Sequence, residues 1–472
     1  MHLTAEYRPF ARTGGLAEAV QGLATYQAAD GEPTTVLLPL YRSVREAGAE
    51  LVPEGDAFTV KVGPRSETVR LLRLKAKRGP RVLFLEHDEY YDRAGLYGEG
   101  GQDYPDNARR FACFSCAAVT ALDRLVEPPA VLHAHDWHTA LAPVYARLSG
   151  DPLKGRMPCV LSVHNAGFQG HFDRDTLADI GLPDSLWAVD GMEWYGKLNL
   201  LKGGLKYSDA VTTVSPTHAY ELRTEVGGFG LHDMFIGLRD RLTGILNGID
   251  QRTWNPATDP LIAAHFSPDA LAGKDACKAA LQRTWNLPVD ANTPIFAMSA
   301  RLVSQKGLDL VLGGEALRQA HAQFVFLGAG EARYEDTLRG IAAAMPERVA
   351  AHFIFTDEAE HELLAGADFL LMPSLYEPCG LTQMRAQRYG ALPIGRRVGG
   401  LADTVEDEVT GFLFDDYTPA AFDVAVRRAL ALFADRPARL EHARIAMGRD
   451  FGWERSVERY LEVYQRALAA RG

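Results

Sequence analysis

Short apolar runs alternate with loops and amphipathic stretches along most of the 472-residue chain. In the first half the runs lie at 3–5, 35–39, 82–85, 131–135, 159–163 and 210–214. Apolar runs of this length, bounded by turn residues, are typical of buried strands. Residues 197–205 are predicted to form one helix, and residues 95–107, rich in Gly and polar side chains, a long loop. Repetition of strand, loop and helix predicts a parallel, doubly wound sheet.

The pattern restarts after an irregular stretch that carries Asn247-Gly248 and several prolines. New apolar runs follow at 295–298, 324–327, 353–355, 369–372 and 391–394. We therefore expect an α/β protein with two doubly wound domains, 1–243 and 244–454. Ligands bind beyond the carboxyl ends of strands in such sheets, which predicts two domains facing across a deep cleft.

The tail, 455–472, is predicted to be a helix that packs back toward the N-terminal domain. Its apolar side chains recur at helical spacing, together with one just ahead of it. They are Trp453, Val457, Tyr460, Leu461 and Tyr464.

Composition narrows the classes of partner. The chain has 50 basic and 61 acidic residues, a net charge of −11 and a pI near 5.7, which argues against nucleic acid or an anionic membrane surface. No apolar run approaches about 18 residues, so no membrane span or signal peptide is expected. The five cysteines are an odd, sparse set, which favours a reducing compartment. We expect a cytoplasmic protein.

The clearest candidate site is the turn 374–381, which follows the apolar run 369–372. Pro378 and Gly380 mark the turn, and a helix is predicted from about Leu381. A strand, a tight turn and a helix N-terminus present backbone N–H groups to an anion. Glu377 has no neighbouring Lys or Arg in the sequence, so we expect an unpaired carboxylate whose partner is the substrate. A helix-capping acid is the alternative interpretation.

Other polar clusters also follow predicted strands. Gly14 and Gly15 precede a helix from about Leu16 and allow close approach of a ligand. His133, His135, Asp136 and His138 raise the hypothesis of a metal site of the zinc-hydrolase type. The usual H-x-H-x-D-H order is not met, because Asp136 directly follows His135. For His133 we expect a structural role in hydrogen bonds at the strand end.

Taken together, these motifs resemble the family of bacterial glycogen synthases and plant starch synthases, which are retaining glucosyltransferases with two Rossmann-like domains (the GT-B architecture). The resemblance covers nearly the whole chain in order. It rests on Arg12-Thr13-Gly14-Gly15-Leu16, His135-Asp136-Trp137-His138, His164-Asn165, Asn247-Gly248-Ile249-Asp250, Arg301-Leu302, Gln305-Lys306-Gly307, Glu377-Pro378-Cys379-Gly380-Leu381 and Gly399-Gly400-Leu401-Ala402-Asp403-Thr404-Val405.

The resemblance implies ADP-glucose as donor, the non-reducing end of glycogen or another α-1,4-glucan as acceptor, and no metal or cofactor. Glu377 would face the glucose, with Asp136 and His164 on the opposing domain. Arg301 and Lys306 follow a predicted strand and are the cations expected at the leaving diphosphate. The expected substrate-binding residues are Arg12, Gly14, Gly15, His138, Asn165, Asn247, Cys379, Gly380, Leu381 and Thr382.

Two departures from the family pattern stand out. Arg12 occupies the place of the family's usual Lys, and Phe168 replaces the usual Tyr in the segment after His164-Asn165. Three alternatives stay open: a related transferase that uses UDP-glucose or another acceptor, a zinc hydrolase built on the histidines, and a non-catalytic glucan-binding protein.

Overall fold

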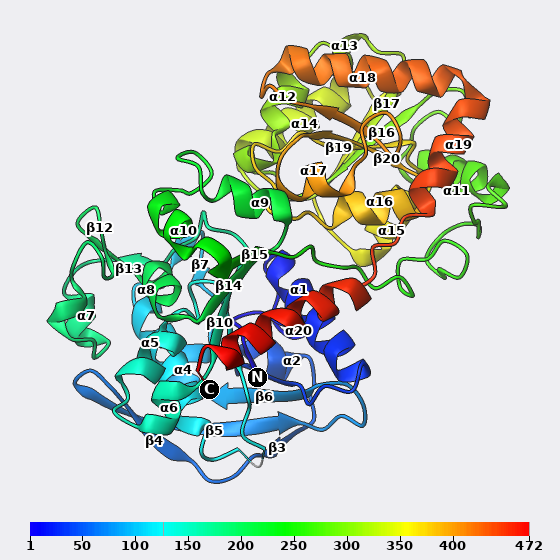
Figure 1. The fold of residues 1–472 in the computed structure, drawn as a ribbon. Coiled ribbons are helices and arrows are strands. Elements are labelled where there is room, and N and C mark those ends of the chain that lie inside the picture. The colour runs from blue at the N-terminus through cyan, green and yellow to red at the C-terminus, as the bar shows by residue number, and fades with distance from the viewer. Residues whose placement is uncertain (126, 472) are drawn as a thin grey trace. The chain divides into compact units, whose positions relative to one another are not determined.

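The computed structural model describes residues 1–125 and 127–471, and the chain divides into two compact units (Figure 1). One unit comprises Met1–Gly248 and the C-terminal stretch from Trp453, and the other comprises Ile249–Gly452. The boundary at Gly248 lies slightly beyond the predicted boundary at 243. The last residue of the predicted tail, Gly472, lies outside the described residues. Within those residues no helix is both long and apolar enough to cross a membrane.

The first unit is built, within its described residues, on a ten-stranded sheet of order β15-β14-β10-β9-β1-β2-β6-β5-β3, with β4 paired to β5. The strands are β1 (His2–Leu3), β2 (Thr35–Pro39), β3 (Leu51–Pro53), β4 (Phe58–Val62), β5 (Arg65–Leu74), β6 (Arg81–Glu86), β9 (Leu132–His135), β10 (Cys159–Val163), β14 (Ala210–Thr213) and β15 (Leu242–Gly244). The strands from β15 to β6 are parallel, and β3, β4 and β5 form an antiparallel edge. Strand order reverses between β1 and β9, so the loops after these two strands lie at the topological switch point.

Helices cover the parallel strands, which are buried on both faces and therefore appear in the sequence as continuous apolar runs. The main helices of this unit are α1 (Gly15–Ala29), α4 (Asn107–Ala121), α5 (Leu141–Leu148), α8 (Leu200–Tyr207), α9 (Pro216–Glu221), α10 (His232–Leu238) and α20 (Glu454–Ala469). Shorter helices are α2 (Arg42–Glu46), α3 (Asp88–Tyr91), α6 (Pro152–Arg156) and α7 (Thr176–Asp179). All five residues of β10 are buried, which matches this pattern.

The C-terminal helix α20 lies against α1 in the first unit (Figure 1). Its buried side chains, among them Val457 and Tyr460, join a cluster with Leu23 of α1. Trp453 fills the space beside Gly22, where an added Cβ would lie 2.3 Å from the indole Nε1. Burial of each large apolar side chain contributes about 1.5–3 kcal/mol, so the tail is a structural part of this unit.

The second unit, residues 249–452, contains a six-stranded sheet of order β18-β17-β16-β19-β20-β21. All its strands are parallel: β16 (Ile295–Ser299), β17 (Gln323–Leu327), β18 (Val349–His352), β19 (Phe369–Met372), β20 (Leu392–Arg396) and β21 (Phe412–Phe414). Its helices are α11 (Ala272–Thr284), α12 (Leu308–Gly313), α13 (Ala316–Gln319), α14 (Ala332–Ala344), α15 (Asp357–Gly366), α16 (Thr382–Arg388), α17 (Gly399–Thr404), α18 (Pro419–Ala434) and α19 (Arg436–Met447). Strand order reverses between β16 and β19, which makes the loops after these strands the switch point of this unit.

Three sequence predictions need correction. The expected loop 95–107 contains a small hairpin, β7 (Gly98–Glu99) paired with β8 (Gln102–Asp103). The expected helix 197–205 begins instead with strand β13 (Lys197–Asn199), because this segment pairs with β11 (His171–Phe172) and β12 (Glu193–Trp194). The expected strand 353–355 lies beyond the end of β18, and Ile354 is exposed.

Candidate active site

The two switch-point loops of the second unit are packed against each other. After β16 the chain forms a short turn of 3-10 helix, Ser304–Lys306, that ends at Gly307 with φ +73°. A Cβ at Gly307 would lie 1.9 Å from the carbonyl oxygen of Pro373, so only glycine fits here. The N–H of Leu375 donates to the carbonyl of Gln305 at 2.8 Å. The loop after β16 is thereby held beside the loop after β19.

This packing brings Lys306 to Glu377. The Lys306 Nζ lies 2.6 Å from Glu377 Oε2, and the Ser374 hydroxyl donates to the same oxygen at 3.0 Å. Glu377 is only 5% exposed. The prediction of an unpaired Glu377 carboxylate is therefore wrong: its cation is distant in the sequence and comes from the turn that follows the neighbouring strand β16. A buried carboxylate is stable when it is paired and hydrogen-bonded in this way.

The glycines of the segment 399–405 fix the backbone of the Glu377 turn. Gly399 has φ +43°, and a Cβ there would lie 2.0 Å from the carbonyl oxygen of Glu377. The N–H of Gly400 donates to that same carbonyl at 3.1 Å. A Cβ at Gly400 would lie 2.0 Å from the carbonyl oxygen of Cys379. The segment after β20 thus buttresses the Glu377 turn through its backbone.

The residues after Glu377 form the start of α16. Gly380 has φ +69°, Leu381 precedes the helix, and Thr382 is its first residue. The buried Gln383 side chain donates to the carbonyls of Cys379 at 2.9 Å and Gly380 at 3.1 Å. Cys379 is 5% exposed and forms no disulfide within the described residues. Gln383 was not predicted from the sequence, although its place in the first turn of the helix after the motif points to a structural role.

Arg301 follows the same strand as Lys306 but is placed differently. Its side chain is exposed, and no ion pair joins it to Glu377 or to another carboxylate in the described ranges. The structure therefore assembles Lys306 with Glu377 and leaves Arg301 as an exposed cation at the same strand end.

In the first unit, Asp136 and the His164-Asn165 segment come together. Asp136 directly follows β9 and has φ +57°, an unusual conformation for a residue with a side chain. Its Oδ1 accepts the N–H of His164 at 2.7 Å and that of Asn165 at 3.4 Å. Burial raises the pKa of Asp136 to about 7, because the two N–H groups offset the loss of hydration only in part. The nearby Glu6 carboxylate also raises it.

His164 is half-buried and lies at the end of β10. Its Nε2 is 2.9 Å from His135 Nδ1, and burial lowers its pKa to about 4. The neighbouring Asn165 accepts the N–H of Gly167 through Oδ1 at 2.9 Å, which forms an Asx turn. A neutral imidazole and a fixed polar turn are therefore presented at the carboxyl edge of the sheet.

The glycine motif is anchored by a buried carboxylate that the sequence did not single out. Glu6 accepts the N–H groups of Thr13 at 2.8 Å and Gly14 at 3.2 Å. It also accepts the hydroxyls of Thr13 and Tyr97. The Tyr97 ring stacks on His138 with centroids 4.5 Å apart. Two features of the sequence point to these residues. Tyr97 lies in the long polar segment 95–107, and Glu6 lies just after the first predicted strand.

Neither packing nor backbone conformation requires glycine at Gly14 or Gly15. No heavy atom of the residues that the structure describes lies within 4 Å of a Cβ built at either position, and neither residue has positive φ. Glycine here leaves open space in front of the first turn of α1. Arg12 is exposed beside this space, with Nη2 3.8 Å from Glu18 Oε1.

Two more predicted binding residues are buried. His138 is 8% exposed, and burial lowers its pKa to about 3, with a further contribution from the Arg110 guanidinium. Asn247 follows β15 and is 7% exposed. The Nδ1 of His138 and the Oδ1 of Asn247 have no hydrogen-bond partner among the described residues.

The residues that lie close enough to share a metal ion differ from the predicted set. Within 1–125 and 127–471 that group is His2, His133 and His135, without Asp136 or His138. All six ring nitrogens of these histidines already lie within hydrogen-bond distance of a protein atom. His133 contacts Tyr464 Oη and Ser162 Oγ, each at 2.7 Å, which confirms its expected structural role.

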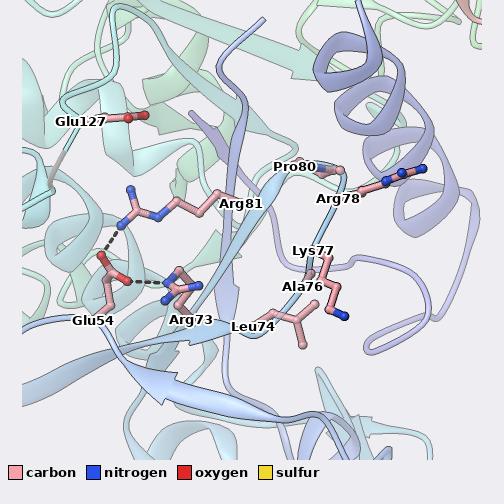
Figure 2. A pocket seen from close by; sticks show the side chains of 10 residues that line it. Glu54, Arg73, Leu74, Ala76, Lys77, Arg78, Pro80, Arg81 and Glu127 are labelled. Atoms are coloured by element: carbon pink, nitrogen blue, oxygen red, sulfur yellow. Dashed lines mark hydrogen bonds and ion pairs between the residues drawn. The ribbon is translucent and has the colours of Figure 1, made fainter. Parts of the chain in front are cut away.

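A hollow of about 500 Å³ lies elsewhere in the first unit (Figure 2). Its lining includes Arg73 and Arg81, which both form ion pairs with Glu54. Arg81 is the first residue of β6, so the hollow lies at the amino end of a parallel strand. Ligand sites of doubly wound sheets lie at the opposite, carboxyl edge, where the predicted site residues are.

Two family descriptions match the sequence. Residues 1–236 match the starch synthase catalytic domain, and residues 283–444 match glycosyl transferases group 1. The chain is 41% identical to a glycogen synthase of Syntrophotalea carbinolica over 98% of this chain and 97% of the relative. It is 42% identical to a glycogen synthase of Anaeromyxobacter dehalogenans, with 98% of each chain covered.

Solved structures give the same result. The catalytic domain of starch synthase IV from Arabidopsis thaliana, bound to ADP and acarbose, superposes with a TM-score of 0.91 at 31% identity over 99% of each chain. A sucrose-phosphate synthase from Thermosynechococcus elongatus superposes with a TM-score of 0.62 at 17% identity, which shows a shared fold. The predicted pair of Rossmann-like domains with GT-B architecture is confirmed.

Proposed function

Because the chain belongs to the family of glycogen synthases and starch synthases, we propose that it transfers glucose from ADP-glucose to the non-reducing end of an α-1,4-glucan, with retention of configuration. The observation that carries this proposal is the ion pair of half-buried Lys306 with buried Glu377 at the switch point of the second unit. ADP is bound in the related starch synthase structure, which supports an adenine nucleotide donor. None of the five cysteines, all of which lie in the described part of the chain, forms a disulfide, which supports a cytoplasmic location.

The chemistry requires both charges of the pair. When the bond between glucose and ADP breaks, negative charge develops on the leaving diphosphate and positive charge on the sugar. Lys306 and Arg301 would stabilise the first, and the Glu377 carboxylate would stabilise the second and orient sugar hydroxyls. In the free protein Lys306 and Glu377 neutralise each other, so the site holds both groups in place before the donor binds.

Retention fits a site without a separate nucleophile. The acceptor hydroxyl would attack on the face that the diphosphate leaves, and a departing phosphate oxygen would take the hydroxyl proton. Cys379 is held as a small, 5% exposed wall residue beside the turn, and its thiol has no role in this scheme.

The first unit would supply groups for the sugar and the diphosphate. Asp136 holds the backbone of His164 and Asn165, and His164 would contact the transferred glucose. The open space in front of Gly14 and Gly15, at the N-terminus of the 15-residue helix α1, suits a phosphate group. Arg12 would add a cation there. Its guanidinium is planar and forked, whereas the Lys that is usual in the family carries a compact ammonium group.

Transfer of labelled glucose to glycogen tests the proposal. We expect incorporation from ADP-glucose in the presence of a chelator, and a product that an α-1,4-specific glucan hydrolase digests. A matched reaction with UDP-glucose measures donor choice. Incorporation only from UDP-glucose would overturn the donor assignment. Full transfer activity after exhaustive chelation would exclude the zinc-hydrolase alternative, whereas complete loss of transfer would show that the reaction requires a metal ion.

A further inference from the structure

A row of hydrogen-bonded side chains leads from helix α1 to His164. Gln27 Oε1 lies 2.7 Å from His2 Nε2, and His2 Nδ1 lies 3.0 Å from His135 Nε2. His135 Nδ1 in turn lies 2.9 Å from His164 Nε2. The first three residues of this row are at most 3% exposed. Buried polar groups of this kind are hydrogen-bonded, so each ring nitrogen of His2 and His135 is satisfied by its neighbour in the row.

The sheet makes this row possible. Strands β1 and β9 are adjacent and parallel, with His2 paired to His133. Side chains alternate along a strand, so His135 lies on the same face of β9 as His133. On this face Gln27 comes from α1 and Tyr464 from α20. The histidines are therefore set by strand register rather than by a flexible loop.

All three imidazoles of the row are neutral at pH 7. Burial lowers the pKa of His2 to about 3, that of His164 to about 4, and that of His135 well below its ordinary value. A neutral imidazole carries one N–H donor and one acceptor nitrogen. In a row of such rings, each contact needs one donor and one acceptor. The tautomer of one ring therefore fixes the tautomers of the others.

Gln27 selects between the two possible directions. Its Nε2 donates to the Tyr464 hydroxyl at 3.1 Å, which leaves Oε1 to accept from His2. His2 must then carry its proton on Nε2, and its Nδ1 accepts from His135 Nε2–H. By the same reasoning His164 donates Nε2–H to His135 Nδ1. The His164 Nδ1 is left as an acceptor, and no residue in the described ranges donates to it.

We propose that Gln27, His2 and His135 are positioning residues that hold His164 in its Nε2–H tautomer, so that Nδ1 meets the bound sugar as an acceptor for a hydroxyl group. The sugar contact rests on the proposed function, whereas the tautomer is a property of the free protein. An unprotonated Nδ1 accepts a hydrogen bond from a sugar hydroxyl. A protonated Nδ1, in the other tautomer, would instead donate to a lone pair of a sugar oxygen. The row thus determines which partner donates the hydrogen bond between His164 and the sugar.

Nitrogen-15 NMR of the protein labelled at histidine tests the tautomer without any substrate. We expect His164 to show a protonated Nε2 and an unprotonated Nδ1, assigned by comparison with His164→Gln. In Gln27→Met the acceptor for His2 is lost, and we expect both tautomers of His164 in exchange. In Gln27→Glu the carboxylate still accepts from His2, so the wild-type pattern should return. A wild-type spectrum with His164 protonated at Nδ1 would overturn the proposal.

Kinetics supply the second readout. Gln27→Met should lower kcat/KM for the sugar-nucleotide donor about tenfold, the effect of one hydrogen bond, and Gln27→Glu should restore most of it. Gln21→Met is the matched control, because Gln21 lies on the same helix and its side chain bonds, among the described residues, only to Thr25. Equal activity of Gln27→Met and Gln21→Met would contradict the role of the row. If no variant, wild type included, transfers glucose, the proposed function fails while the NMR still decides the tautomer.

Added Zn²⁺ separates the row from a metal site at His2, His133 and His135. We expect the histidine spectrum of the folded protein to be unchanged, because every ring nitrogen in this group is already bonded. Loss of the His2 and His135 N–H signals on addition of stoichiometric Zn²⁺ would show a metal site and would contradict the hydrogen-bonded row.

Discussion

At the scale of single residues, the proposed chemistry depends on charged side chains that are paired with each other in a buried site. Lys306 and Glu377 form an ion pair of 2.6 Å in which the carboxylate is almost fully buried. Removal of one partner leaves the other charge without compensation, which is costly in a buried site. The two residues should therefore behave as one unit in both stability and catalysis.

We expect Glu377→Ala and Lys306→Ala each to lower the rate of glucose transfer by at least about a hundredfold, the effect of losing one electrostatic contact in the transition state. The double variant should be little worse than the worse single one. Initial rates over a range of ADP-glucose concentrations measure this, with Glu358→Ala as an exposed control in the same unit. Fully additive losses would contradict a coupled pair, and near wild-type turnover of Glu377→Ala would exclude its role.

Asp136 gives a prediction about pH. Its pKa is raised to about 7 in the folded protein, so between about pH 4 and 7 the native state binds a proton that the unfolded state does not. The contribution of this residue to stability therefore falls as pH rises through that window. Compared with wild type, Asp136→Asn should gain stability between pH 5 and pH 8, on the order of 2–4 kcal/mol.

Chemical denaturation of both proteins at the two pH values measures this difference. The Asn variant should also lose transfer activity, since a neutral amide, which can still accept the His164 N–H, replaces the ionisable carboxylate. A stability difference that does not change with pH would show that Asp136 is ionised in the folded protein throughout this range.

At the scale of elements, the predicted motifs contain glycines that the backbone geometry requires and glycines that it does not. Gly399 is required by its positive φ and by the carbonyl of Glu377, whereas Gly15 has open space in front of it. We expect Gly399→Ala to destabilise the protein by about 1–3 kcal/mol, because the new methyl group would displace the backbone of the Glu377 turn. Gly15→Ala should leave stability within about 0.5 kcal/mol and raise KM for the donor.

Thermal melting and donor saturation curves distinguish the two variants. If Gly15→Ala bound the donor as wild type does, the open space before α1 would not be a ligand site. If Gly399→Ala melted as wild type does, the close contact with Glu377 would not be rigid.

Much of this level of structure could be predicted from the sequence. Strands such as Thr35–Pro39 and Cys159–Val163 match their apolar runs, because parallel strands are buried on both faces. The failures lie where distant segments decide the local structure. Lys197–Asn199 becomes a strand through pairing with two other segments, and the cation that pairs with Glu377 lies in the turn after a neighbouring strand. Glu6 and His2 were not predicted because they belong to no recognisable sequence motif. Their hydrogen-bond partners are brought to them when the fold buries these side chains.

At the scale of the whole molecule, the end of the chain completes its first unit. Helix α20 covers a face of the sheet, and Trp453 lies directly over Gly22 of α1. This docking is a long-range contact that helical spacing in the tail alone could not locate. It also places Tyr464 against Gln27 and His133, and so connects the tail to the histidine row.

We expect Gly22→Ala to lower the free energy of unfolding by about 1–3 kcal/mol, since a methyl group would overlap the Trp453 indole. Gly237→Ala is the matched control: it lies in helix α10, has no neighbour within 4 Å of its Cβ, and should be neutral or slightly stabilising. Denaturation midpoints of the two variants measure the effect. An unchanged midpoint for Gly22→Ala would show that the tail is not firmly docked.

Transfer of glucose from a nucleotide to a glucan releases one nucleotide per glucose, so the decisive measurement is the rate of ADP release from ADP-glucose with and without glycogen. The account predicts fast release that depends on glycogen, with one glucose incorporated per ADP, and almost none in Glu377→Ala. Release at the same rate without glycogen would mark a hydrolase, and no release in either case would contradict the account.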